Sequence, residues 1–468
     1  MTTSLAFPTR SEHAPHTWGS AVYGVMLNHR PAFEAYANAM HEPPYRAPPQ
    51  HPVLYIKPGN THCGDGPITV PDGHIELEYG PCLALVMGSN TRDCPPEKAL
   101  TKVAGLLTVA DVRIPHQNLY RPSIPMIARD GFCPMAKRMT RLSDAGDPDQ
   151  LGVRVWIDGQ LIHVTSTADR LRNAAQLVAA LSQTMTHHHR WFGTFGQCLC
   201  DGKGRRMKTA RVVYAGAVHE AYPDVCDDNY IVLQNGRRLL QSSVQWLAPF
   251  QVGTIIALGL NYADHLKELS QELSIGSKDE PLVFLKTATS LLGHRGETLR
   301  PSDASFMHYE CELAVVIGKP ARRLALDEAL DHVLGYTICN DYAVRDYLEN
   351  WYRPNLRAKN RDQSTVLGPW LVSADEIPDP QGLTLKTYVN RELKQQGRTA
   401  NMVHSVAEII HYLSSFMTLR PGDLILTGTP EGVVNVQAGD EVITEIEGIG
   451  SLVNHLISQD FMSAAKDR

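Results

Sequence analysis

Two acidic residues stand two positions apart in the sequence, where they could bind a metal ion together. Glu310 and Glu312 belong to the stretch YECELAVVI, residues 309–317, which is apolar and β-branched and is followed by Gly318. This composition predicts a β-strand. Because side chains alternate between the two faces of a strand, Glu310 and Glu312 share a face. Neighbouring carboxylates repel each other and are costly to bury without a positive charge, so a cation must lie between them.

A third carboxylate, Asp341, ends the next apolar run, GYTICND, residues 335–341. Mg²⁺ and Mn²⁺ prefer carboxylate oxygens as ligands. Three carboxylates that leave coordination positions open for water and substrate make a catalytic metal site. Glu310, Glu312 and Asp341 are therefore the candidate metal ligands. The alternative is a solvated strand edge at which the two glutamates pair with a basic side chain.

The composition is that of an ordinary globular protein. The chain has 468 residues, 43% of them hydrophobic and 20% charged, a length that predicts about two to four domains. The net charge of −6 gives no reason to expect a nucleic acid or an acidic membrane as a partner. No apolar run is long enough for a signal peptide or a membrane span. Nine cysteines without CxxC pairs fit reduced thiols. These features predict a cytoplasmic protein.

Apolar runs of the N-terminal half return after about 230 residues. VYGVMLNH (22–29) parallels IIALGLNY (255–262), and LALVMG (83–88) parallels LAVVIG (313–318). A fixed period of this length means that one fold is used twice. Short β-branched runs between Gly and Pro turns dominate both copies, which predicts a β-rich α+β fold in two tandem modules. Helical periodicity is clearest over two short stretches, 326–335 and 405–416.

The predicted organisation has four parts. They are a disordered tail over 1–20, a first module over 21–186, a linker over 187–206, and a catalytic second module over 207–468. The linker replaces the stretch LRPGDLILTGTPEGV of the second copy, so the first module is expected to lack its closing strands.

The two copies differ in the charged residues that would do chemistry. In the alignment, Glu310 and Glu312 fall opposite Gly80 and Cys82, and Asp341 falls opposite Val112. Three further charged residues of the second copy meet small or apolar ones: His265, Glu268 and Lys359 fall opposite Ala32, Ala35 and Ile127. The first module is therefore predicted to fold without holding a metal.

His265 and Glu268 follow the run IIALGLNY at helical i, i+3 spacing, which places them on one face of a helical turn. A carboxylate beside an imidazole fixes its tautomer and raises its basicity, as in a general acid/base pair. The alternative is an ordinary surface pair. The run after them, residues 270–280, is polar and contains glycine, as a lid over a site would be.

Four blocks in this order resemble the fumarylacetoacetate hydrolase family. They are residues 255–269, 308–341, 340–370 and 419–433. The resemblance covers 207–468 strongly and 21–186 more weakly. It implies tandem mixed β-sandwich or roll modules, packed as an intrachain pseudo-dimer, in a monomer or a low homo-oligomer. It also implies a site that uses Mg²⁺ or Mn²⁺ on a 2-oxo dicarboxylate or tricarboxylate.

The same resemblance implies roles for individual residues. His265 and Glu268 match the family's acid/base dyad, and Arg345 and Lys359 match cations that contact substrate oxygens. Four positions are expected to bind substrate: Asn261, Tyr262, Lys286 and Thr429. Arg345 could instead form a structural salt bridge. Lys286 returns in the first copy as Lys57, which fits a structural role equally well.

The blocks resemble family members that decarboxylate 5-oxopent-3-ene-1,2,5-tricarboxylate and isomerise 2-hydroxyhepta-2,4-diene-1,7-dioate in homoprotocatechuate catabolism. Both reactions pass through a dienolate that a metal ion stabilises. One site is therefore expected to serve both steps. The alternative is a hydrolase that cleaves a carbon–carbon bond of a diketo acid, with the dyad activating water. A metabolite-binding or scaffold role suits the first copy alone.

Overall fold

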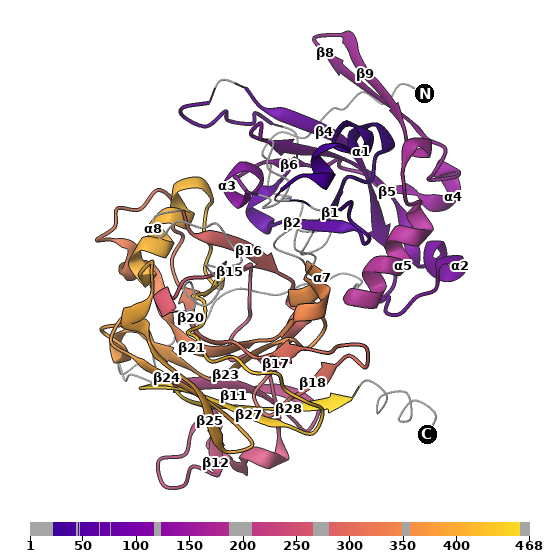
Figure 1. The fold of residues 1–468 in the computed structure, drawn as a ribbon. Coiled ribbons are helices and arrows are strands. Elements are labelled where there is room, and N and C mark those ends of the chain that lie inside the picture. Colours follow the sequence, from indigo (N-terminus) through magenta and orange to yellow (C-terminus); the bar gives the residue numbers. More distant parts are fainter. Residues whose placement is uncertain are drawn as a thin grey trace. The chain divides into compact units, whose positions relative to one another are not determined.

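The computed structural model describes residues 22–458, apart from 44, 46, 65, 75, 117–122, 187–207, 265–279 and 349–355. The chain divides into two compact units, residues 1–192 with 349–356 and residues 193–348 with 357–468 (Figure 1). The predicted tail and linker fall on residues that are not described, so these boundaries stay predictions. No described helix is both long enough and apolar enough to cross a membrane.

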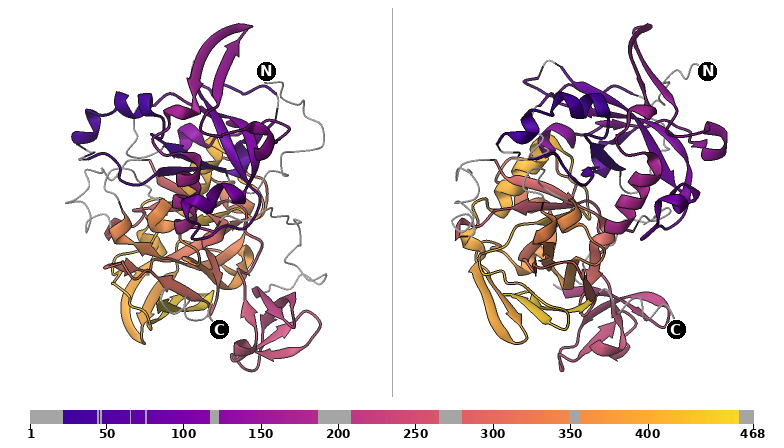
Figure 2. Two further views of the ribbon diagram at one scale, coloured as in Figure 1. Left: turned by 90° about the vertical axis from the view of Figure 1, so that its right-hand side faces the viewer. Right: turned by 45° about the vertical axis from the view of Figure 1, so that its right-hand side comes forward.

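The second module is built on one large sheet formed by the apolar and β-branched runs of the sequence. Its strand order is β13-β12-β11-β10-β23-β21-β20-β26-β15-β16, with β14 beside β10 and β17 beside β23. Most pairs are antiparallel, whereas β15–β26 and β17–β23 are parallel. Figure 2 shows β10–β13 as a small lobe at one end of this sheet. The strands are β10 Lys208–Tyr214, β11 Ala217–Pro223, β12 Tyr230–Leu233, β13 Arg238–Leu240, β14 Gln245–Trp246, β15 Ile255–Gly259, β16 Leu282–Lys286, β17 Leu291–Gly293, β20 Cys311–Ile317, β21 Val333–Asp341, β23 Thr365–Ser373 and β26 Leu424–Leu426.

A second sheet, of five strands, lies against the first. Its order is β18-β28-β27-β24-β25, and β24 lies against β20 while β27 and β28 lie against β21. The stacked sheets confirm the predicted β-rich α+β fold. The strands are β18 Glu297–Arg300, β24 Thr384–Val389, β25 Glu392–Arg398, β27 Glu441–Ile446 and β28 Gly450–Ser458. The remaining elements are β19 Met307–His308, β22 Ala343–Val344, α7 Leu356–Lys359 and α8 Val406–Phe416.

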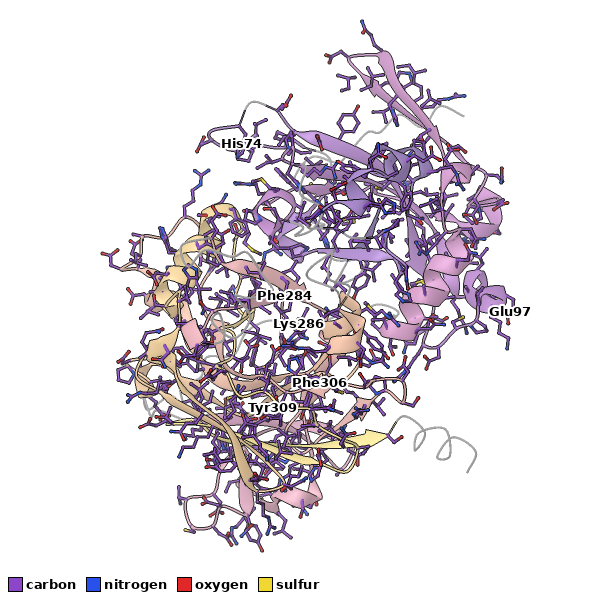
Figure 3. All side chains as sticks on the ribbon, viewed as in Figure 1. His74, Glu97, Phe284, Lys286, Phe306 and Tyr309 are labelled. Atoms are coloured by element: carbon purple, nitrogen blue, oxygen red, sulfur yellow. The ribbon has the colours of Figure 1, made fainter. Side chains whose placement is uncertain are left out.

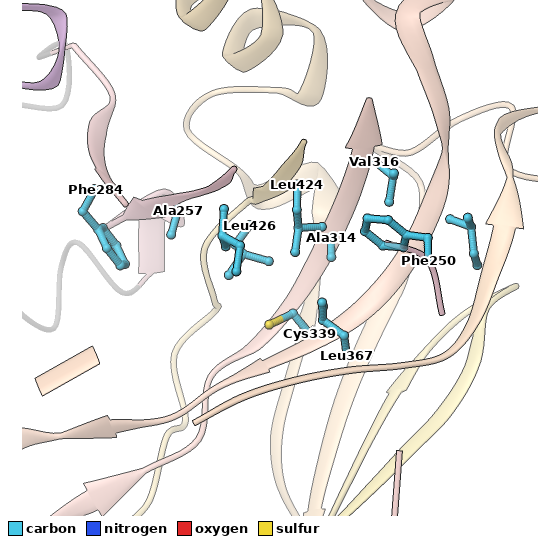
Figure 4. Close-up of a cluster of buried hydrophobic side chains, with 11 residues drawn as sticks. Phe250, Ala257, Phe284, Ala314, Val316, Cys339, Leu367, Leu424 and Leu426 are labelled. Atoms are coloured by element: carbon cyan, nitrogen blue, oxygen red, sulfur yellow. The ribbon is translucent and has the colours of Figure 1, made fainter. Parts of the chain in front are cut away.

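One face of the large sheet is apolar over most of its width and becomes charged at one end. Its core cluster (Figure 4) consists of Phe250, Ile255, Ala257, Phe284, Ala314, Val316, Cys339, Leu367, Leu371, Leu424 and Leu426. Three charged residues, Glu312, Asp341 and Lys286, each stand two positions from a member of this cluster on the same strand. Because side chains alternate along a strand, these charges share the apolar face. The core thus leads directly into the candidate site.

The first module repeats this plan with fewer strands. Its ladders are β1–β2, β4–β5–β7, β3–β6 and β8–β9. The elements are β1 Val22–Met26, α1 Arg30–Ala35, β2 Val53–Lys57, β3 His62–Cys63, β4 Glu78–Met87, α2 Pro96–Ala99, β5 Val103–Arg113, α3 Ile124–Ile127, β6 Cys133–Pro134, β7 Thr140–Arg141, α4 Leu142–Ala145, β8 Gly152–Ile157, β9 Gln160–Ser166 and α5 Ala174–Thr184.

Local details of the two modules match and confirm the repeat. The residue that follows β1 and the residue that follows β15 adopt the same left-handed backbone conformation, with φ 58° at Leu27 and 59° at Leu260. Helices α5 and α8 both begin with a reciprocal capping box, formed by Asn173 and Gln176 in α5 and by Ser405 and Glu408 in α8. Such a cap satisfies two backbone N–H groups at the helix start, which explains why the predicted helix over 405–416 forms.

The hairpin β8–β9 shows what the first module lacks. Its counterpart in the second module is β24–β25, where β24 also pairs with β27. Within the described part of the chain, β8 pairs only with β9. The hairpin extends from the body of its module (Figure 2) and exposes the apolar side chains Trp156, Ile157, Leu161, Ile162 and Val164. An isolated hairpin is marginally stable in water, so this strand edge is incomplete in the described part of the first module.

The predicted helix over 326–335 is wrong. Only Ala329–His332 form a 3₁₀ turn, and Val333 already begins β21. Leu326 and Leu330, which gave the stretch its helical periodicity, are exposed and form no buried face. A pattern of apolar residues stabilises a helix only where a neighbouring surface covers it, and here the pairing of β21 takes up the end of the stretch.

The lowered pKa of a buried histidine makes the stability of the second module depend on pH. His294 accepts a hydrogen bond from the Val453 N–H at 3.1 Å through Nδ1, and burial, with a smaller effect of Arg295, lowers its pKa from 6.5 to about 3. Below pH 6.5 the unfolded chain therefore binds a proton that the folded chain does not, and stability falls. Between pH 7.5 and 5.5 we expect a loss of about 1.4 kcal/mol from this residue.

Urea unfolding at the two pH values measures this loss. His294→Gln, which keeps a hydrogen-bond acceptor, should lose less stability between pH 7.5 and 5.5 than the wild type. His163→Gln, which changes an exposed histidine of β9, serves as the control. An equal loss in the wild type and in His294→Gln would show that His294 is not the group responsible.

Candidate metal centre

Three carboxylates meet at the charged end of the large sheet. One ligand oxygen from each of Glu310, Glu312 and Asp341 lies within 4.8 Å of the other two, and the described residues contain no other such group. Glu312 lies on β20 and Asp341 ends β21, which are neighbouring antiparallel strands. Glu310 directly precedes β20, and its carbonyl oxygen accepts a hydrogen bond of 2.9 Å from the Asp341 N–H. The prediction that Glu310 and Glu312 share a face is confirmed.

Two lysines neutralise much of this negative charge. Lys286 Nζ lies 2.6 Å from Asp341 Oδ1, while Lys359 Nζ lies 2.5 Å from Glu310 Oε2 and 3.0 Å from Asp341 Oδ2. At 4.8 Å or less, two carboxylates repel each other by about 3 kcal/mol or more at an effective dielectric constant near 20. The two ammonium groups offset this repulsion. They provide the positive charge that the sequence predicts beside the glutamates.

Burial shifts the protonation of the cluster. It raises the pKa of Glu312, with Asp341 and Glu310 adding to the effect. For Asp341, burial acts in the same direction, but Lys286 and Lys359 outweigh it and lower the pKa. Burial alone would lower the pKa of Lys359, yet the carboxylates of Asp341, Glu310 and Glu312 raise it. The cluster therefore holds the charged Lys359 beside the carboxylate of Asp341.

The residues fit a hard divalent cation. Glu312 is fully buried, its Oε2 accepts a hydrogen bond of 2.6 Å from the Gly428 N–H, and its Oε1 has no partner among the described residues. A buried carboxylate oxygen without a partner is costly. All three side chains offer oxygen atoms, the donor type that Mg²⁺ and Mn²⁺ prefer. A metal ligand must be deprotonated, so with all three carboxyl groups ionised the carboxylates and two lysines carry a net charge of −1, and a divalent cation brings the centre to +1.

The loop after β26 is held against this cluster. Thr427 donates its hydroxyl to Leu313 O at 2.9 Å, and Gly428 binds Glu312 through its N–H. Gly428 has φ +88°, and a Cβ there would lie 3.0 Å from the Cβ of Asn261. A side chain at this position would strain the backbone and disturb its close approach.

Asn261 connects this loop to the segment before α8. Its amide nitrogen donates to Thr427 O at 2.8 Å and to His404 O at 3.1 Å. Its Oδ1 accepts from the His404 N–H at 2.9 Å. Both polar ends of this buried side chain are thus bound to main-chain atoms, which gives Asn261 a role in holding the loop.

Tyr262 and Arg345 present polar atoms that lack protein partners in the described part of the chain. Tyr262 is 1% exposed, and its hydroxyl has no hydrogen-bond partner there. Burial raises the pKa of Tyr262, and Cys311 and Glu312 raise it further. Arg345 is half-buried, and its Cζ lies 6.0 Å from the centroid of the Phe306 ring. Its Nε has no hydrogen-bond partner among the described residues.

Sequence analysis did not identify His308, which lies beside the cluster. Figure 3 marks its neighbours Phe306 and Tyr309, together with Phe284 and Lys286 on β16. His308 Nδ1 lies 3.1 Å from Tyr309 O and 3.7 Å from Glu310 Oε1. Burial lowers its pKa to about 4, against a smaller opposing effect of Glu310. The ring is neutral near pH 7 and donates Nδ1–H to the carbonyl. The one signal in the sequence was its position two residues before Glu310.

The first module retains one of the three carboxylates, which corrects the sequence alignment. In β4–β5, Gly80 pairs with Asp111 and Pro81 with Ala110, whereas in β20–β21 Cys311 pairs with Asn340. Both ladders shift register at the same point, after Val86 and Val316. The matched ladders place Asp111, not Val112, at the position of Asp341. The 230-residue offset between LALVMG and LAVVIG, carried on to these strands, also places Asp111 opposite Asp341, so the alignment with Val112 was shifted by one residue.

Asp111 is bound by protein groups. Lys57 Nζ, the counterpart of Lys286, lies 2.6 Å from Asp111 Oδ1, and the Tyr55 hydroxyl donates to Oδ2 at 2.5 Å. Tyr55 occupies the position of Phe284 in the matching ladder. Its ring requires Gly24, because a Cβ there would lie 1.9 Å from the ring. The first module thus keeps the lysine–aspartate ion pair, and the Tyr55 hydroxyl takes the place of Lys359 at the second carboxylate oxygen.

The remaining predicted residues divide between the site and the undescribed segments. Thr429 follows Gly428 directly and is 4% exposed. His265 and Glu268 lie outside the described residues, so their pairing stays a prediction from the sequence.

Removing one carboxylate should weaken metal binding and abolish activity. We expect Glu310→Gln and Asp341→Asn to lower Mn²⁺ affinity by more than about 100-fold, because changing even the outer partners of metal ligands costs about 10- to 100-fold. Calorimetric titration with Mn²⁺ measures this directly.

The matched control is Asp111→Asn, the same change at the corresponding position of the first module. It should leave Mn²⁺ affinity unchanged. If Glu310→Gln and Asp341→Asn both bind Mn²⁺ as the wild type does, the three carboxylates are not the metal site.

The chain is similar to a known family and to several known proteins. The family model described as "Fumarylacetoacetate (FAA) hydrolase C-terminal" matches residues 21–196 and 254–457. The chain is 42% identical to the 4-hydroxyphenylacetate degradation bifunctional isomerase/decarboxylase of Salmonella dublin, over 94% of this chain and 98% of that protein. It is also 42% identical to the homoprotocatechuate catabolism bifunctional isomerase/decarboxylase of Escherichia coli, with the same coverage. A solved 2-hydroxyhepta-2,4-diene-1,7-dioate isomerase from Mycobacterium marinum is 35% identical, and the match covers 54% of this chain and 99% of that one at a TM-score of 0.47. The chain belongs to the fumarylacetoacetate hydrolase family.

Proposed function

We propose that this chain decarboxylates 5-oxopent-3-ene-1,2,5-tricarboxylate and isomerises 2-hydroxyhepta-2,4-diene-1,7-dioate in 4-hydroxyphenylacetate catabolism. The observation that carries the proposal is the complete set of Glu310, Glu312 and Asp341 within 4.8 Å in the second module. Relatives with 42% identity over 94% of the chain are named as isomerase/decarboxylases of this catabolism, which supports the choice of substrates.

The three carboxylates would hold Mg²⁺ or Mn²⁺. A bound ion supplies Lewis acidity that stabilises the negative charge developing on the 2-oxo oxygen of the substrate. Charge balance favours an anionic substrate, because the three carboxylates, two lysines and a divalent cation together carry a net charge of +1.

Cations of the second module are suited to bind the carboxylates of the substrate. Lys359 lies on the edge of the cluster, with Nζ 2.5 Å from Glu310 Oε2. Arg345 has an Nε without a partner in the described part of the chain, and a guanidinium suits a carboxylate because its N–H groups match the two oxygens. Lys286 is fully buried against Asp341 and donates to the carbonyl of Lys359. We assign Lys286 to positioning Asp341 and Lys359, and Arg345 and Lys359 to substrate oxygens.

The two reactions share their chemistry. Loss of CO₂ leaves an electron pair that is delocalised through the conjugated chain as a dienolate, and a proton then adds to carbon. Isomerisation removes the proton of the 2-hydroxyl group, forms the same kind of dienolate, and adds a proton at a distant carbon. A single acid/base group can therefore serve both reactions. We assign proton transfer to the imidazole of His265, oriented by Glu268.

The two modules share their strands, but only the second has all three carboxylates, and this difference suggests how they are used. We propose that the first module is a partner domain without a metal, packed with the second as an intrachain pseudo-dimer that imitates a dimer of single-module relatives. The chain would then bind one metal ion, act as a monomer or low homo-oligomer, and work in the cytoplasm. The retained core and the protein-bound Asp111 support a structural role for the first module.

An assay with both acids tests the proposed function. Purified protein with Mg²⁺ should release CO₂ from 5-oxopent-3-ene-1,2,5-tricarboxylate and convert 2-hydroxyhepta-2,4-diene-1,7-dioate into its 2-oxo tautomer. Hydrolytic cleavage of fumarylpyruvate or fumarylacetoacetate, with no turnover of the two acids, would replace the proposal with a hydrolase.

His265→Ala separates proton transfer from metal binding. We expect kcat to fall by about 10²- to 10⁴-fold, the usual contribution of a positioned acid/base group, while Mn²⁺ affinity stays close to that of the wild type. Steady-state rates and a parallel Mn²⁺ titration measure both quantities. Normal turnover by His265→Ala would return this residue to the surface pair that the sequence also allows.

A further inference from the structure

A buried glutamine donates a hydrogen bond to the hydroxyl of Thr429. Gln395 lies on β25 and is 1% exposed. Its Nε2 lies 2.9 Å from Thr429 Oγ1 and 2.7 Å from Pro430 O. Its Oε1 accepts a hydrogen bond of 3.1 Å from the hydroxyl of Thr387, its direct partner across the β24–β25 ladder. Hydrogen bonds therefore connect Thr387 of the second sheet, through Gln395, to Thr429 of the loop after β26.

The orientation of the Gln395 amide is determined by its neighbours. A carbonyl oxygen such as Pro430 O can only accept hydrogen bonds, so the NH₂ group of Gln395 must face it. The flipped amide would place two carbonyl oxygens 2.7 Å apart. With one hydrogen on Pro430 O, the second hydrogen of Nε2 is donated to Thr429 Oγ1.

This orientation leaves Thr429 with one role toward a ligand. Its oxygen accepts from Gln395, so its single hydrogen must be donated elsewhere, and the described residues provide no acceptor for it. Thr429 directly follows Gly428, whose N–H binds the carboxylate of Glu312, so Thr429 belongs to the loop that contacts the metal centre. We propose that Gln395 is a positioning residue that makes Thr429 a hydrogen-bond donor to a carboxylate of the bound 2-oxo acid. The proposal rests on the proposed function for the class of ligand.

The loop after β26 packs directly against β25, which brings Thr429 within hydrogen-bond distance of Gln395. A Cβ at Gly397 would lie 2.6 Å from Pro430, and a Cβ at Gly432 would lie 3.0 Å from Lys394 O. The Tyr309 hydroxyl donates to Gly432 O at 3.0 Å. Because two glycines permit this approach and a hydrogen bond fixes its far end, Thr429 has little freedom to move away from Gln395.

The first module provides an internal comparison. In the β8–β9 ladder, Val155 and His163 pair at the positions that Thr387 and Gln395 occupy in β24–β25. Valine has no hydroxyl, and His163 is exposed. The module that lacks Glu310 and Glu312 thus also lacks the side chains that would orient a threonine, as expected if the line of hydrogen bonds serves the ligand and not the fold alone.

A double-mutant cycle tests the proposal on the full chain. The probe is oxalate, a small dicarboxylate, titrated by calorimetry into Mn²⁺-loaded protein. Thr429→Val should weaken oxalate binding about ten-fold or more, the loss of one hydrogen bond to a charged group. Gln395→Glu should have a similar effect, because a carboxylate there would accept the hydrogen of Thr429. The double variant should bind within about two-fold of Thr429→Val, since Gln395 acts through Thr429.

Controls separate positioning from damage to the fold. Thr429→Ser keeps the hydroxyl and should retain oxalate affinity. Gln396→Glu makes the same change one residue further on β25, where the side chain is exposed, and should leave oxalate binding unchanged. All variants should bind Mn²⁺ as the wild type does. If Gln395→Glu does not, Gln395→Met replaces it in the same cycle under the same criterion.

Wild-type affinity in the Gln395 variant, or effects of the two substitutions that multiply, would overturn the proposal. Oxalate binding needs no turnover, so the outcome is independent of the proposed reactions. A protein that binds oxalate in this way but turns over neither acid would contradict the proposed function and leave the role of Gln395 intact.

Discussion

The second module depends on one electrostatic constraint, the approach of three carboxylates, two of them fully buried, to within 4.8 Å of one another. Their mutual repulsion must be offset inside the protein, where water cannot screen it. Lys286 and Lys359 supply two positive charges, and a bound divalent cation would supply the remainder. The neighbouring structure follows from this need: β20 and β21 bring the carboxylates together, β16 brings Lys286, and the loop after β26 places the Gly428 N–H on Glu312.

The first module shows the same scaffold after the constraint has been removed. Without counterparts of Glu310 and Glu312, only Asp111 remains to be neutralised, and Lys57 with the Tyr55 hydroxyl is sufficient. Gly24 leaves the space that the Tyr55 ring occupies. Lys57 and Lys286 make the same ion pair in both modules, so this lysine is part of the scaffold. The ion pair between Lys359 and Glu310 has no counterpart in the described part of the first module, and this is where we place the chemistry.

Much of this could be predicted from the sequence, because the signals involved are local or periodic. Alternation along one strand placed Glu310 and Glu312 on a common face, the repeat period revealed two modules, and the capping residue Ser405 marks a helix that forms. The contacts that determine charge could not be predicted this way. Lys286 on β16, Lys359 on α7 and Asp341 on β21 are distant in the sequence and meet only in the folded module. The alignment of Asp341 with Val112 was one residue out, as the ladder register shows. The stretch 326–335 lacked the covering surface that a helix needs.

The central claim is that one metal centre, in the second module, serves both reactions. The most direct test is to remove metal with a chelator and restore it by stepwise addition of Mn²⁺ while both CO₂ release and formation of the 2-oxo tautomer are measured. The two activities should return in parallel and reach their maxima together at one equivalent of Mn²⁺ per chain. An activity that survives without metal, or two activities that saturate at different equivalents, would contradict a single shared centre.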